Sequence, residues 1–202
     1  IGDAANRAAL DAFEATADAW RRAGLRQRIE HAQLLDAAEL PRFAALGVAA
    51  SVQFSHAPSD RDLADRFWEG HGGAYAYGAL LERGAHLANG SDAPVEELDP
   101  LHGIVAGVLR TLDERPAWRP EQAVTAEQAL RATCVEPAWL AQDERRRGTL
   151  APGMLADLVV LDRDPLACRA EELPELRVVA TMVGGRFTYV SEGPFLGISE
   201  AS

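Results

Sequence analysis

The sequence predicts an α/β protein whose larger part is a section of a (β/α) barrel. Short apolar runs alternate with segments of helical spacing, and two of these runs lead to a residue that can bind a metal, His31 in one and Asp92 in the other. In (β/α) barrels the functional side chains come from the C-terminal ends of the strands. After Gly148 the pattern becomes extended, which indicates a small second unit of β-strands.

Three apolar runs in the first part predict parallel strands, and they are residues 25–32, 48–54 and 85–89. The middle run has no polar alternation at its start, as expected for a strand that is covered on both faces. The polar stretch that follows it, residues 55–73, is long enough to be a functional loop between a strand and a helix.

Caps and stop signals predict five helices in the same part, at residues 3–24, 36–46, 74–83, 99–113 and 125–136. Asp3 is the expected N-cap of the first helix, and Asp36 with Glu39 resembles a capping box at the second. Thr125 and Gln128 form the same pattern before the last helix, which we expect Pro137 to interrupt.

The second part has three extended runs, residues 157–161, 178–183 and 186–190. Gly184 and Gly185 separate the last two, and a two-residue glycine turn is typical of a β-hairpin. We therefore place a domain boundary between residues 1–147, the barrel section, and residues 148–202, the β unit with its C-terminal tail.

Composition excludes several partners. The 20 basic residues are all arginines, and against 31 acidic residues they leave a net charge of −11, which repels nucleic acid and anionic membranes. Without lysine, the chain cannot supply a carbamylated lysine as a metal ligand. No apolar run approaches the ~20 residues of a membrane span. We expect a cytoplasmic protein that binds neither nucleic acid nor membrane.

Two interpretations are open for each of the two residues at the ends of the apolar runs. The imidazole of His31 either presents a nitrogen to a metal or is a core histidine bonded to a backbone carbonyl. The carboxylate of Asp92 either accepts a proton from a metal-activated water or serves as an N-cap or Asx-turn residue, since Gly-Ser-Asp sequences favour turns.

Four segments, taken in order, resemble the amidohydrolase superfamily, and they are residues 28–33, 47–56, 90–95 and 148–162. The most similar branch is the family 3 type, which includes N-substituted formamide deformylase. The resemblance implies a (β/α)8 barrel that carries a β-sandwich built from residues near both ends of a longer chain. This chain would then be the C-terminal part of such a protein, with barrel strands six to eight.

The resemblance also implies roles for three residues. His31 would end the sixth strand as a metal ligand, and Asp92 would end the eighth, touch the metal and accept a proton from the attacking water. His56 would contact the substrate, although a solvated loop histidine is the alternative for it. His71, His86 and His102 are expected to have no catalytic role, and Arg110 to make a salt bridge or a helix-end contact.

The expected cofactor is a divalent metal, zinc, as one or two ions, with the remaining ligands upstream of Ile1. The implied reaction is hydrolysis of a carbon–nitrogen bond, other than a peptide bond, in a small amide-like substrate. The alternative is a catalytically incomplete fragment. Three barrel strands leave two open edges, which require the missing N-terminal half, a second copy in a homo-oligomer, or another chain.

Overall fold

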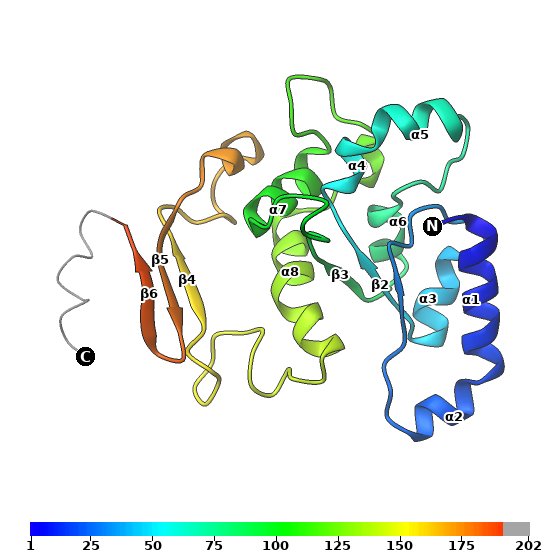
Figure 1. The fold of residues 1–202 in the computed structure, drawn as a ribbon, viewed down its shortest axis with the longest axis horizontal. Coiled ribbons are helices and arrows are strands. Elements are labelled where there is room, and N and C mark those ends of the chain that lie inside the picture. Colours follow the sequence, from blue (N-terminus) through cyan, green and yellow to red (C-terminus); the bar gives the residue numbers. More distant parts are fainter. Residues whose placement is uncertain (192–202) are drawn as a thin grey trace.

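The computed structural model describes residues 1–191. A sheet of three parallel strands lies among the helices of the first part, and a second three-stranded sheet lies on the C-terminal side (Figure 1). The first sheet consists of β1 (Arg28–Glu30), β2 (Ala49–Val52) and β3 (Leu87–Asn89), in that order. The three predicted strands are confirmed, each shorter than its apolar run.

Side-chain burial explains why β2 is the central strand. Ala49, Ala50 and Val52 are fully buried, so this strand is covered on both faces, whereas the ends of β1 are exposed. In register, Arg28 pairs with Ala49 and Ala50 pairs with Leu87. The sheet and its helices share one apolar core, and the strand order leaves β1 and β3 each with a single neighbour.

The helices cover this sheet and connect its strands (Figure 1). They are α1 (Asp3–Ala15), α2 (Ala17–Arg22), α3 (Leu40–Leu46), α4 (His56–Ser59), α5 (Arg61–Phe67), α6 (Tyr77–Glu82), α7 (Pro100–Leu109) and α8 (Ala126–Leu140). Two 3₁₀ helices, η1 (Pro120–Gln122) and η2 (Ala170–Glu175), complete the set in the described part. Both of the strongest cap predictions are confirmed, since the Asp99 side chain accepts from Leu101 N and Thr125 with Gln128 forms a capping box.

The first predicted helix is wrong in two details. It is divided at Thr16, whose hydroxyl donates to the carbonyl of Ala12 and so competes with the helical backbone. Its N-cap is Gly2 and not Asp3, which lies in the first turn. Trp20 of α2 is buried, and its indole N–H donates to the carbonyl of Phe13 in α1 at 2.8 Å, which ties the two segments together.

Three other expectations are also corrected. Pro137 does not interrupt α8, because a proline removes one hydrogen bond while Ala132, Glu136 and Ala138 keep the helix packed. The predicted loop 55–73 contains the two short helices α4 and α5. Glu39 makes no capping box with Asp36, because its carboxylate is paired with arginines of α1 and α3.

The second sheet is an antiparallel meander of β4 (Leu158–Leu161), β5 (Val178–Val183) and β6 (Arg186–Val190). All three strands agree with the prediction, and Gly184 and Gly185 have positive φ angles of 57° and 79° in the turn between β5 and β6. The unit contacts the first part mainly through η2 and α7, where Leu173 and Leu176 pack against Val105.

Among the described residues, no helix is both long enough and apolar enough to cross a membrane.

Candidate functional site

His31 directly follows β1 in a left-handed backbone conformation, with a φ of 67°. Its amide donates to the carbonyl of Ser51 at 2.7 Å, which extends the pairing of β1 with β2 by one residue. Its Nδ1 lies 3.0 Å from Oε1 of Gln53. An amide oxygen only accepts, so Nδ1 is the donor in this contact, and in the Nδ1–H tautomer of the ring Nε2 is the nitrogen that can bind a metal. The alternative of a core histidine bonded to a backbone carbonyl is therefore wrong, because the partner of Nδ1 is a side chain.

His56 is the first residue of α4 and is buried, with 7% of its surface exposed. Its ring stacks on that of His31 with a centroid distance of 5.9 Å and an interplanar angle of 15°. Its Nε2 is buried and has no hydrogen-bond partner among residues 1–191. The solvated-loop alternative is wrong, and a buried unpaired nitrogen beside a second imidazole requires an explanation.

Asp92 lies in the turn after β3, also in a left-handed conformation, with a φ of 56°. Its side chain is exposed, and within residues 1–191 its carboxylate makes no hydrogen bond or ion pair. The side chain that supports this turn is Ser91, whose hydroxyl accepts from the amide of Ala93 at 3.2 Å. The Asx-turn interpretation of Asp92 is therefore not supported.

Sequence reasoning missed two buried polar residues that build this edge of the sheet, Gln53 and Asn89. Gln53 holds His31, and its own carbonyl accepts from the Tyr77 hydroxyl at 2.8 Å. Asn89 ends β3, and its Oδ1 accepts from the amide of Phe54 at 2.8 Å. The available signal was a polar residue inside or at the end of an otherwise apolar run.

Glu30 places a negative charge beside His31. Partial burial raises the pKa of its carboxyl, but hydrogen bonds from Ser51 and Arg28 outweigh that effect and hold the pKa below its ordinary value. The carboxylate therefore stays ionised at neutral pH.

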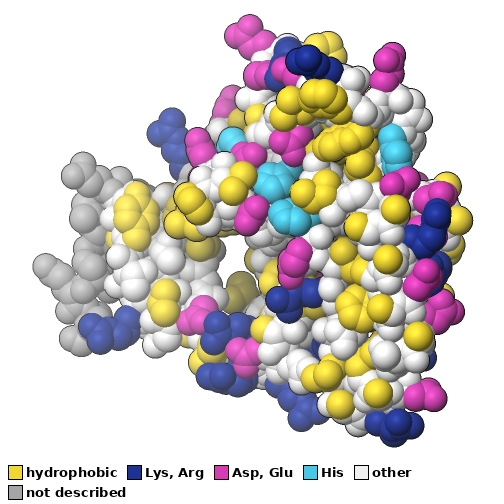
Figure 2. Space-filling model, turned by 45° about the vertical axis from the view of Figure 1, so that its right-hand side comes forward, with side chains coloured by type: hydrophobic (Ala, Val, Ile, Leu, Met, Phe, Trp, Pro, Cys, Tyr) yellow, Lys and Arg dark blue, Asp and Glu magenta, His cyan; other side chains and the backbone are white. Residues whose placement is uncertain are grey.

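The structure brings His31 and His56 into contact and leaves Asp92 at the same end of the sheet without contact to either. Histidine side chains lie near the middle of one face, with acidic side chains close by (Figure 2). In the described part of the chain, no group of three or more His, Cys, Asp and Glu side chains could hold a metal ion.

Each of the remaining histidines faces a carboxylate. His71 lies 3.5 Å from Asp3, His86 lies 2.8 Å from Glu136, and His102 lies 3.9 Å from Glu97. That they lack a catalytic role stays a prediction. Arg110 is the C-cap of α7, which agrees with the expected helix-end contact. It forms no salt bridge within residues 1–191.

The fold and this edge define an α/β protein with polar residues gathered at the carboxyl ends of parallel strands. The chain belongs to the amidohydrolase family, whose model matches residues 1–189. The predicted resemblance is thereby confirmed.

Known relatives are similar over nearly the whole chain. Protein LONG AFTER FAR-RED 3 of Arabidopsis thaliana is 36% identical over 193 residues, which are 94% of this chain and 33% of that protein. N-substituted formamide deformylase of Arthrobacter pascens is 30% identical over 200 residues, 96% of this chain and 36% of that enzyme. The crystal structure of an uncharacterised metal-dependent hydrolase of Pyrococcus horikoshii has a TM-score of 0.72 and 32% identity, covering 85% of this chain and 34% of that one.

The coverage values also show how much of each relative this chain represents. The chain spans about a third of each of these relatives. The solved structure supports a mixed α/β fold of the amidohydrolase superfamily for the part that is present.

Proposed function

We propose that this chain is the C-terminal section of a metal-dependent hydrolase that cleaves carbon–nitrogen bonds, other than peptide bonds, in small amide-like substrates. Residues 1–147 supply barrel strands six to eight as β1, β2 and β3, and β4, β5 and β6 are strands of a composite β-sandwich, while the tail 192–202 lies outside the described residues. The family membership, the parallel strands with connecting helices and the two single-neighbour edges support this assignment.

The donors present fit a zinc ion. His31 offers its Nε2, because Gln53 binds the other ring nitrogen, and Asp92 offers a carboxylate that is unpaired within residues 1–191. Nitrogen and oxygen donors suit zinc, and a catalytic zinc has three protein ligands. We therefore assign His31 and Asp92 as ligands and place the others in the rest of the protein. When bound, the metal would polarise the substrate carbonyl and lower the pKa of water.

The single observation that carries the proposal is the buried, unpaired Nε2 of His56 beside the His31 ring. A group that costs stability when unpaired is retained where a ligand pairs with it. We assign His56 to the substrate, where its N–H would stabilise the carbonyl oxygen as negative charge develops. Asp92 would accept the proton of the attacking water and pass it to the leaving amine.

The second candidate function is assembly without turnover. It is favoured by the open edges of β1 and β3 and by the absence of a three-residue metal cluster in residues 1–191. In this version the chain alone is inactive and binds its missing half or a second copy of itself. Metal content separates the two candidates, because a section without its partner ligands holds zinc weakly.

The test uses the full-length protein that contains this chain, and residues 1–202 alone as the comparison. We expect metal analysis to find zinc in the full-length protein and N-substituted amides to be hydrolysed, with loss of turnover on chelation and recovery on adding zinc. Residues 1–202 alone should be inactive. Unchanged turnover after verified metal removal would overturn the proposed chemistry, and turnover by the short chain at the full rate would overturn its assignment as a section.

A further inference from the structure

We propose that Gln53 is a positioning residue that holds His31 in the tautomer and orientation needed to bind the metal, and that Tyr77 and Arg110 keep Gln53 in place. The inference rests on the proposed role of His31 as a ligand. It extends the site to three buried residues on different elements, none of which contacts the metal in this proposal.

The first step is the contact between the two side chains. Gln53 directly follows β2 and is 8% exposed, and its Oε1 lies 3.0 Å from His31 Nδ1. A hydrogen bond from Nδ1 to an oxygen favours the tautomer in which Nε2 can bind a metal, and it fixes the plane of the ring. Such partners of metal-binding histidines typically change metal affinity 10–100-fold.

The second step is the anchoring of Gln53 itself. Its carbonyl accepts two hydrogen bonds, from the Tyr77 hydroxyl at 2.8 Å and from the His56 amide at 3.2 Å. Tyr77 begins α6 and is 1% exposed. Burial raises the pKa of its hydroxyl, so the phenol stays protonated and keeps donating. Helices α4 and α6 therefore hold the backbone of Gln53 from two sides.

The third step is Arg110, which is fully buried and has no carboxylate partner in the described residues. Its guanidinium lies 5.0 Å from the centre of the Tyr77 ring and 5.9 Å from that of Trp118. Its Nε donates to the carbonyl of Trp118 at 3.1 Å, while Nη1 is unpaired. Burying a cation without a counterion is costly, and contact with aromatic rings offsets only part of that cost.

The position of this costly group indicates its purpose. Arg110 holds one face of Tyr77, Tyr77 holds the carbonyl of Gln53, and Gln53 holds His31. A local arrangement that lowers stability is expected where it supports a functional site. The chain of contacts thus connects the C-terminus of α7 to the candidate ligand.

The test compares two replacements of Gln53 in the full-length protein. Gln53→Glu keeps an acceptor at the same place, whereas Gln53→Leu has similar size and no acceptor. The matched control is Gln122→Leu, because the Oε1 of Gln122 also accepts a hydrogen bond, from Ala79 N at 3.1 Å, away from His31. Zinc affinity is measured by competition with a chromophoric chelator, and melting temperature is measured on the same samples.

We expect Gln53→Leu to weaken zinc binding about 10–100-fold, with Gln53→Glu at or above the wild-type affinity. Tyr77→Phe should give a smaller loss in the same direction. Gln122→Leu should lower the melting temperature without changing zinc affinity. Rescue by glutamate is the readout that a merely structural role for Gln53 would not produce.

Wild-type affinity in folded Gln53→Leu, or equal losses in the leucine and glutamate variants, would overturn the inference. If the leucine variant does not fold, Gln53→Met makes the same comparison, since its flexible side chain fills a similar space and accepts only weakly. The proposed function fails separately: His31→Ala would then bind zinc as tightly as the wild type.

Discussion

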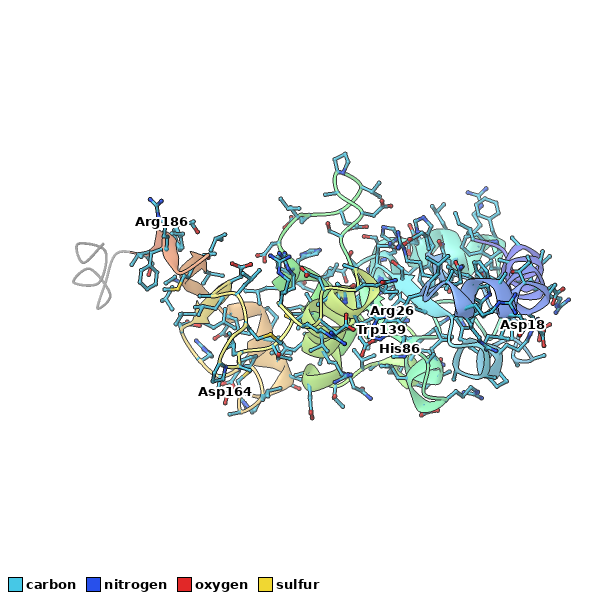
Figure 3. All side chains as sticks on the ribbon, turned by 90° about the horizontal axis from the view of Figure 1, so that it is seen from below. Asp18, Arg26, His86, Trp139, Asp164 and Arg186 are labelled. Atoms are coloured by element: carbon cyan, nitrogen blue, oxygen red, sulfur yellow. The ribbon has the colours of Figure 1, made fainter. Side chains whose placement is uncertain are left out.

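Both ends of the parallel sheet carry histidine and acidic side chains, but within the described residues some of these side chains lack partners at one end, and those at the other end are paired. At the C-terminal end, the buried His56 nitrogen is unpaired and the Asp92 carboxylate has no partner within residues 1–191. At the N-terminal end, Arg26, His86 and Trp139 lie side by side (Figure 3) and carboxylates complete their contacts.

The contacts of the N-terminal end form one connected cluster. The Trp139 ring stacks on His86 at 3.8 Å and an angle of 11°, and the Arg26 guanidinium lies 4.6 Å from the Trp139 ring centre. Arg26 binds both oxygens of Glu144, at 2.6 and 2.9 Å. Glu136 accepts from His86 at 2.8 Å. This cluster attaches α8 and the turn after it to the residues that precede β1 and β3.

The difference teaches how to separate chemistry from stability in this fold. Barrel proteins place catalysis at the C-terminal face and stabilising contacts at the N-terminal face. A histidine beside a carboxylate, such as His86, is explained by that partner. A buried histidine without a partner, such as His56, is explained by what it would bind.

The largest effect is expected from Asp92→Asn in the full-length protein. The amide is nearly the same shape but cannot accept a proton, so turnover should fall by a factor on the order of hundreds or more. Stability should not change, because the side chain is exposed and unpaired in the described structure. Steady-state kinetics with metal analysis checks this. Wild-type turnover with metal bound would show that Asp92 is not the proton acceptor.

His56→Phe should separate activity from stability. Phenylalanine keeps an aromatic ring against His31 but removes the unpaired nitrogen. We expect turnover to fall on the order of a hundredfold, with unfolding free energy unchanged or raised, since no buried polar atom is left unpaired. Kinetics and denaturant unfolding give both values. A large loss of stability with normal turnover would place His56 among the structural residues.

Glu136→Gln should have the opposite signature at the other end. Glu136 is 6% exposed and accepts from His86 and Arg131, so its replacement should lower the unfolding free energy by about 1–3 kcal/mol and leave turnover unchanged. Denaturant unfolding near neutral pH measures the loss. A fall in turnover without destabilisation would contradict the division between the two ends.

Comparing the unfolding free energies of the wild type and Glu136→Gln at different pH values tests the ionisation of Glu136. The hydrogen bond from His86 holds the pKa of the Glu136 carboxyl below its ordinary value of 4.5, against the effect of burial. A pKa lowered by folding contributes stability that is complete above the ordinary value and is lost as pH falls through the folded value. The difference between wild type and Glu136→Gln should therefore shrink below about pH 4.5. A constant difference would show that ionisation of Glu136 is not involved.

The smallest effect is expected from Arg26→Lys. Lysine keeps the charge but loses the two-point contact with Glu144 and the flat contact with Trp139. The melting temperature should fall less than in Glu136→Gln. Arg21→Lys is the matched control, because Arg21 lies over Trp20 at 5.0 Å without a carboxylate partner in residues 1–191. Equal shifts in both would assign the effect to stacking alone.

Local signals were sufficient for much of the fold. The capping box of Thr125 and Gln128, the cap at Asp99 and the turn at Gly184 involve residues only a few positions apart. Their chemistry is complete within one turn of chain, so the sequence contains the whole interaction. The position of His31 at a strand end was predictable for the same reason, because an apolar run precedes it directly.

Contacts between distant segments could not be read in this way. The continuation of α8 through Pro137 depends on what the helix packs against. Gln53 pairs with His31, the Arg110 guanidinium lies over the Tyr77 ring, and the His56 ring stacks on that of His31. Each of these contacts joins residues that are 22 or more positions apart. Whether a polar group is paired depends on the folded neighbours, and on that pairing rests our proposal that His31 and His56 are functional and His86 is structural.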